Sequence, residues 1–186
     1  MFLAVHAAVG AIAGNSVESP TAAFALGFIS HFFIDMIPHG DADMYEGYKS
    51  GEKKKLALIY LWGDVLATIA LIVLFFIRQD FFSPLNVALG IVGGLLPDII
   101  VGLFEILKPR RHRWAYRKLE SFHALHMRNH AWFGKFLPTN KVYEQANEFM
   151  YDLKFNMKAF TERDIPLRYG LMLQGIMLFI CLKAIL

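Results

Sequence analysis

Two residues four positions apart, His31 and Asp35, have the types and the spacing needed to grip a metal ion. Helical side chains at positions i and i+4 lie on one face, so the imidazole and the carboxylate point the same way. Pro38 then ends the helix, and His39 follows at its mouth as a further candidate ligand. Imidazole with carboxylate suits zinc, with manganese or iron as alternatives. The structural alternative is a buried His–Asp hydrogen bond that pins two helices together.

Three more histidines lie far along the chain, in the sequence ESFHALHMRNH at 120–130. His123, His126 and His130 are spaced three and then four positions apart, so a helix places them on one face. We expect this segment to fold over the mouth of the first pair and to complete its coordination. All three are therefore candidate metal ligands.

Other ionisable residues lie inside apolar stretches, where charges are costly and usually mark function. They include His6, Asp64, Asp98 and Glu105. At ~1.5 Å per helical residue, all of them fall within roughly 14 Å of one membrane face. His31 and Asp35 lie within the same distance of that face. This layer predicts His6 as a ligand, Asp98 as a ligand or general base, and Asp64 as a base or a group that orients an imidazole. The alternative for each is a hydrogen bond between helices.

The composition indicates a membrane protein. Of the 186 residues, 56% are apolar, and the mean hydropathy is +0.41. A soluble domain of this size buries too little surface to hide so many apolar side chains. The aromatic content of 15% excludes a disordered chain, and the single cysteine, Cys181, excludes a disulfide scaffold.

The apolar segments predict an all-α fold. A hydrocarbon core of ~30 Å takes about 20 helical residues, and three segments have that length: 56–77, 85–107 and 166–186. Two shorter segments, 21–38 and 1–14, bring the polytopic bundle to about five hydrophobic helices. We expect one membrane-embedded domain over 1–186, in which 108–165 is a helical insertion on the cytoplasmic side with an amphipathic helix at 144–160.

The charges between these segments predict the orientation. With five crossings, 17 of the 19 Lys and Arg residues fall on one side, and only Arg78 and Lys183 fall on the other. The positive-inside rule places the N-terminus and 108–165 in the cytoplasm. The basic run 108–118 contains Trp114 and Tyr116, which is typical of segments that contact anionic lipid headgroups. We expect no nucleic-acid partner, and the sequence does not define an oligomeric state.

Four motifs together resemble a bacterial family of inner-membrane metal-dependent hydrolases. The matching pieces are His6, Ser30–Asp35 running into Pro38, Leu95–Asp98 and the histidines of 123–130. Their order differs, because the Ser-His-x-x-x-Asp motif follows Leu-Leu-Pro-Asp in that family and precedes it here. Residues 31–39 are also similar to an element of the zinc-dependent phospholipase C type. The resemblance implies a hydrolase of a bacterial-type inner membrane that uses a divalent metal.

These observations predict a membrane-embedded enzyme that holds one or two divalent ions, of which zinc is the first choice. The metal would activate water, with Asp64 or Asp98 as base, to attack a lipid-like phosphoester or ester at the cytoplasmic face. One alternative is a transporter of divalent cations or protons. The polar residues assigned to the far side, Thr68, Asn86 and Gln174, offer little of the path that transport needs. Another alternative is a scaffold with a structural metal.

Overall fold

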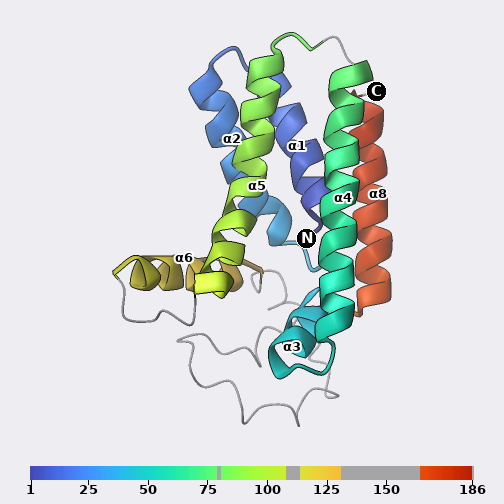
Figure 1. Cartoon of the computed structure of the whole chain (residues 1–186). Coiled ribbons are helices and arrows are strands. Elements are labelled where there is room, and N and C mark those ends of the chain that lie inside the picture. Colours follow the sequence, from blue (N-terminus) through green and yellow to red (C-terminus); the bar gives the residue numbers. More distant parts are fainter. Residues whose placement is uncertain (79–80, 108–113, 131–163, 186) are drawn as a thin grey trace.

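The computed structural model describes residues 1–78, 81–107, 114–130 and 164–185, and over these residues the chain is helical without any strand (Figure 1). The helices are α1 (Leu3–Asn15), α2 (Pro20–Asp35), α3 (Ala42–Ser50), α4 (Lys54–Arg78), α5 (Pro84–Leu107), α6 (Trp114–His130) and α8 (Leu167–Ile185). The predicted all-α class is confirmed for the described part of the chain.

Within the described residues, three helices are long and apolar enough to cross a membrane: Lys54–Ile77, Pro84–Glu105 and Leu167–Ile185. α1 and α2 are apolar but have 13 and 16 residues. At ~1.5 Å per residue they are about 20 and 24 Å long, which is less than the ~30 Å hydrocarbon core. The expectation of about five hydrophobic helices is therefore corrected to three candidate spans and two shorter apolar helices.

The centre of the bundle is the contact of α1, α2 and α5, which pack against one another closely, while α4 and α8 contact α1 (Figure 1). Glycines allow this approach. A Cβ on Gly90 of α5 would collide with the backbone of Gly10 on α1, and a Cβ on Gly27 of α2 would collide with Gly90. Small residues at helix contacts let backbones come close, as membrane helices require.

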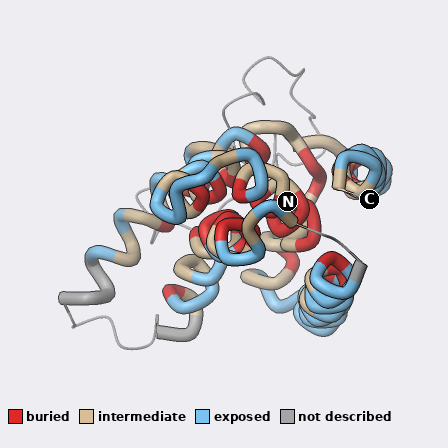
Figure 2. The backbone as a smooth tube through the Cα atoms, turned by 90° about the horizontal axis from the view of Figure 1, so that it is seen from above, coloured by how far each residue is buried: buried red, intermediate tan, exposed pale blue. Residues whose placement is uncertain are grey.

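The outer helices expose apolar side chains. Figure 2 shows buried residues gathered around the N-terminal helix and exposed residues over much of the outer helices. On α4, Ile59, Leu66 and Ile77 are each at least 66% exposed. Such a surface suits contact with lipid rather than water.

One end of the bundle carries the polar elements. α2 ends at Asp35, three residues before Pro38, and Gly40 then takes a left-handed φ of 82° that turns the chain toward α3. α6 lies across the same end, beside the last turns of α5 (Figure 1). Within the predicted insertion 108–165, α6 is therefore helical as expected. The amphipathic helix expected at 144–160 and residues 108–113 of the basic run lie outside the described residues.

Candidate metal centre

Asp35, at the last position of α2, is the centre of a cluster of imidazoles. Its Oδ2 lies 2.9 Å from Nε2 of His31, 3.1 Å from Nε2 of His126 and 3.0 Å from Nε2 of His130. Its Oδ1 lies 3.1 Å from Nε2 of His6. One carboxylate is thus surrounded by four histidines from α1, α2 and α6. The structure brings together residues that are up to 124 positions apart, as the sequence predicted for this pocket.

Four of these groups have the spacing of ligands around one ion. The ligand atoms of His31, Asp35, Asp98 and His126 all lie within 4.8 Å of one another. Bonds of ~2.0–2.1 Å in a tetrahedral zinc site put neighbouring ligand atoms about 3.3 Å apart. The nitrogens of His31 and His126 are 2.9 Å apart, and Asp98 Oδ1 lies 3.8 and 3.6 Å from them. These buried His and Asp groups could hold a metal ion.

Hydrogen bonding aims the imidazole of His31 at the cluster. Its Nδ1 lies 2.7 Å from the carbonyl oxygen of Gly94, which can only accept, so Nδ1 carries the proton and donates. In the neutral ring, Nε2 is therefore left with a lone pair that points toward Asp35. Such an arrangement is typical of metal-bound histidines, whose second nitrogen donates to a carbonyl or carboxylate.

The cluster is buried, and several of its polar atoms lack hydrogen bonds. His6, His31, Asp35 and His126 are each at most 3% exposed. Among the described residues, Asp35 Oδ2, both ring nitrogens of His6 and Nδ1 of His126 have no partner in hydrogen-bond geometry, despite the short contacts around Asp35. Buried polar groups without hydrogen bonds are costly. A cation among these atoms would satisfy the nitrogens and the carboxylate together.

A second group lies beside the first and shares Asp35 with it. The ligand atoms of Asp35, His39 and His130 also lie within 4.8 Å of one another. Burial lowers the pKa of His130 to about 4, despite the opposing charge of Asp35, so its ring is neutral near pH 7. For His39, burial acts to lower the pKa, but the Asp41 carboxylate at 2.9 Å raises it by more. The pKa of His39 therefore lies above its ordinary value.

The helices that carry these residues are held together by local contacts. A Cβ on Gly93 would collide with the backbone of Phe24 on α2, and a Cβ on Gly94 would meet the carbonyl oxygen of His6 at 2.7 Å. The two glycines therefore let α5 approach α2 and α1, which brings Asp98 to the cluster one turn later. Although Pro97 lies inside α5, the helix continues to Leu107.

α6 is held against α2 and α3 by contacts near its candidate ligands His126 and His130. Asn129 Nδ2 donates to the carbonyl oxygen of Phe32 at 2.7 Å. The hydroxyl of Tyr45 on α3 lies 3.1 Å from Glu105 Oε1 and 3.2 Å from Nε2 of His123. His123 also stacks on Phe104 at 4.6 Å between ring centroids. The structure therefore does not bring His123, one of the predicted ligands, into either group.

Asp64, predicted as a base or a residue that orients an imidazole, also lies in neither group. Its carboxylate accepts hydrogen bonds from the backbone amides of Leu3 at 2.7 Å and Ala4 at 3.3 Å. A carboxylate at this place satisfies free amides at the start of α1 and complements the helix dipole. Asp64 thereby fixes the end of α1 from which His6 reaches the cluster.

Two residues that the sequence analysis did not assign to the site hold the loop of His39. Asp164 accepts hydrogen bonds from the backbone amides of His39, Gly40 and Ala42 at 2.8–3.1 Å. Gln174 accepts from Phe2 at 2.6 Å and donates to the carbonyl oxygen of His39 at 3.0 Å. Gln174 therefore belongs to the side of the site and not to the far side, where we expected it. The sequence feature that could have indicated this role is a polar amide within an apolar helix.

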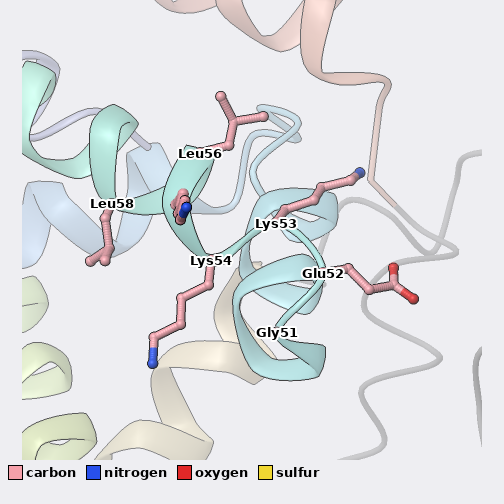
Figure 3. Close-up of a pocket in the computed structure, with 7 residues that line it drawn as sticks. Gly51, Glu52, Lys53, Lys54, Leu56 and Leu58 are labelled. Carbon is pink, nitrogen blue, oxygen red and sulfur yellow. The ribbon is translucent and has the colours of Figure 1, made fainter.

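A groove at the junction of α3 and α4 is separate from this cluster. It has a volume of about 640 Å³ and is lined by Gly51, Glu52, Lys53, Lys54, Lys55, Leu56 and Leu58 (Figure 3). None of the histidines or aspartates of the two groups lines it. Lys53 in this groove is paired with Asp43 at 2.6 Å. The groove lacks the residue types that the predicted chemistry needs.

Comparison with protein-family models, with curated proteins and with solved structures finds no match to this chain. We therefore argue its function from the chemistry of the site alone.

Proposed function

We propose that this chain is a membrane-embedded metal-dependent hydrolase that acts on a lipid-like phosphoester or ester at the cytoplasmic face. The observation that carries the proposal is the unequal spacing within the first group. The nitrogens of His31 and His126 and the oxygen of Asp35 lie 2.9–3.1 Å from one another, while Asp98 lies 3.6–3.8 Å from the two nitrogens.

This spacing divides the group into three ligands and one looser carboxylate. Two histidines and a carboxylate are the ligand set of several catalytic zinc sites, which keep one position open for water or substrate. The ligand types favour zinc, with manganese or iron as alternatives. A divalent ion supplies a Lewis acid there and lowers the pKa of a neighbouring water toward ~7.

Asp98 is suited to act as the base. Its side chain is 23% exposed, whereas that of Asp35 is fully buried, so water and substrate reach the cluster on the side of Asp98. In the proposed reaction Asp98 accepts a proton from water, and the water oxygen bonds to the phosphorus or carbonyl carbon. The ester bond then breaks, and the departing alcohol oxygen takes a proton from Asp98.

The position of the site favours a lipid substrate. The cluster lies at the C-terminal end of α2, where Asp98 of α5 and His126 of α6 approach His31 and Asp35. The polar helices α3 and α6 lie at this end of the bundle (Figure 1). Lys49, Lys53, Lys54 and Lys55 lie at the same end of the bundle, on α3 and at the start of α4. Cytoplasmic membrane faces are rich in basic residues that attract anionic headgroups. We infer that this end faces the cytoplasm and contacts anionic lipid.

A scaffold function is the second candidate, because Asp98 is close enough to act as a fourth ligand. Four protein ligands would close a tetrahedral ion and leave no place for water. The two functions differ in the role of Asp98. As a base it is needed for turnover, whereas as a fourth ligand it is needed for metal binding.

The test is hydrolysis of mixed phospholipids by the purified zinc-loaded protein in micelles. We expect headgroup or acyl release, reduced at least ~100-fold in Asp98→Asn with zinc still bound, because a general base contributes about 10²–10⁴ in rate. Asp43→Asn is the matched control, since this carboxylate pairs with Lys53 and lies in neither group. Loss of zinc in Asp98→Asn, or a zinc-loaded wild type that releases nothing, would favour the scaffold.

A further inference from the structure

We propose that the site holds two divalent ions, bridged by the carboxylate of Asp35, and that its substrate is a phosphoester. The first ion lies among His31, Asp35 and His126, and the second lies among Asp35, His39 and His130. The inference rests on the proposed function and specifies both the metal content and the substrate class of the same site.

The geometry of the second position resembles that of the first. Asp35 Oδ2 and His130 Nε2 are 3.0 Å apart, and the rings of His39 and His130 are 5.0 Å apart between centroids. Nδ1 of His39 lies 2.7 Å from the carbonyl oxygen of Ile37 and donates to it. The lone pair of a neutral ring is therefore on Nε2, as in His31. Both positions thus have a histidine whose tautomer is fixed by a backbone carbonyl.

A single ion would leave much of the cluster unsatisfied. A tetrahedral ion takes four ligands, whereas five imidazoles and the carboxylate of Asp98 gather around Asp35. Apart from His6, they all belong to the two groups. The first group is His31, Asp35, Asp98 and His126, and the second is Asp35, His39 and His130. Because Asp35 is the one residue common to both groups, two ions would share it.

The second position already attracts positive charge. The amino group of Met1 lies 2.6 Å from His39 Nε2, 3.2 Å from Asp35 Oδ1 and 3.3 Å from Asp41 Oδ2. These contacts show that the surrounding groups accommodate a buried cation. The same amino group would compete with a second ion, because it already contacts both His39 and Asp35.

Two bridged ions favour a phosphoester over a carboxyl ester. Ions about 3.5–4 Å apart stabilise the attacking and the leaving oxygens of an in-line displacement at phosphorus. In that reaction the water oxygen bonds to phosphorus while Asp98 accepts its proton. The bond from phosphorus to the ester oxygen breaks, and this oxygen leaves as an alcohol after it receives a proton. A carboxyl ester needs only one ion beside its carbonyl oxygen.

Metal stoichiometry of the full-length protein tests the second ion directly. We expect two Mn²⁺ per wild-type chain, with the electron paramagnetic resonance signal of an exchange-coupled pair. His130→Gln should bind one Mn²⁺ and lose the coupling. Asp43→Asn is the matched control, since this carboxylate pairs with Lys53 and lies in neither group, and it should keep both ions and their coupling. The wild-type spectrum needs no variant, so the proposal stays testable if His130→Gln does not fold.

The outcomes separate this inference from the proposed function. One uncoupled ion per wild-type chain would overturn the second ion but leave a one-ion hydrolase. No bound ion would overturn both. For the substrate class, we expect His130→Gln to lower cleavage of bis(p-nitrophenyl) phosphate by about 10- to 100-fold, and cleavage of p-nitrophenyl acetate far less. A wild type that cleaves only the acetate would contradict the phosphoester assignment.

Discussion

His126 and His123 show how the same residue type acquires different roles one turn apart on α6. Nε2 of His126 lies 3.1 Å from Asp35, within the first group. Nε2 of His123 lies 3.2 Å from the Tyr45 hydroxyl, and its ring stacks on Phe104. The Tyr45 hydroxyl donates its one proton to Glu105 and therefore accepts from Nε2 of His123, and a protonated nitrogen has no lone pair for a metal. The nearest hydrogen-bond partner or cation therefore decides the role of each histidine.

At the residue scale, Asp35→Asn is expected to abolish metal binding. The amide keeps the size of the side chain but removes the charge that faces four imidazole nitrogens. Outer-shell partners alone contribute 10- to 100-fold to metal affinity, so loss of a central ligand should weaken zinc binding by more than about 100-fold. Competition with a chromophoric chelator measures this affinity.

Asp43→Asn is the control for that measurement, because it removes an equal charge at the Lys53 pair. Its zinc affinity should match the wild type. Unchanged affinity in Asp35→Asn would remove Asp35 from the centre of the site.

At the element scale, the close contact of α5 with α1 and α2 depends on glycine. We expect Gly90→Ala to lower the free energy of unfolding by about 1–3 kcal/mol, the usual cost of overpacking, because its Cβ would meet the backbone of α1. Gly102→Ala on the same helix meets nothing within 4 Å and should be neutral or stabilising by up to ~1 kcal/mol. Thermal unfolding in detergent compares them. Equal unfolding midpoints for Gly90→Ala and Gly102→Ala would contradict the close contact of α5 with α1 and α2.

The attachment of α6 makes a second prediction at this scale. Tyr45→Phe removes the hydroxyl that contacts both Glu105 and His123, while all the proposed ligands stay in place. Because α6 carries His126 and His130, zinc affinity should fall by about 10- to 100-fold, as for other residues that orient ligands. Tyr48→Phe, on the same helix, should leave the affinity unchanged. Equal affinities in both variants would show that this contact does not position α6.

At the scale of the whole molecule, the site joins the two ends of the chain. Asp164, just before α8, and Gln174, within α8, hold the loop of His39, and Asp64 of α4 holds the start of α1. Candidate ligands from α2, α5 and α6 meet between these supports, beside His6 of α1. A metal at this place would connect these elements.

Removal of the metal should therefore lower the stability of the whole chain. A ligand present at about 100 times its dissociation constant stabilises the folded state by ~2.7 kcal/mol, so excess chelator should lower the unfolding midpoint and added zinc should restore it. In Asp35→Asn the chelator should have no effect. A wild-type midpoint that does not respond to the chelator would contradict a metal that links these helices.

The sequence predicts the apolar helices and most of the site for definite physical reasons. Hydrophobic length identifies α4, α5 and α8, and helical spacing joins His31 to Asp35 and His126 to His130. His6 lies beside Asp35, and Asp98 lies in the same group as Asp35, in agreement with the common layer. His6 is in neither group, so its role as a ligand stays a prediction. The role of Asp64 could not be predicted, since backbone amides of a distant helix satisfy its carboxylate. The contacts of Gln174 depend in the same way on tertiary packing.

The measurement that tests the metal centre most directly is anomalous X-ray scattering from zinc-loaded crystals, collected on both sides of the zinc absorption edge. We expect an anomalous peak between Asp35 Oδ2 and the Nε2 atoms of His31 and His126. The peak should disappear in Asp35→Asn crystals. Electron density that shows these side chains in place around Asp35, but no anomalous peak among them, would contradict a metal site in this protein.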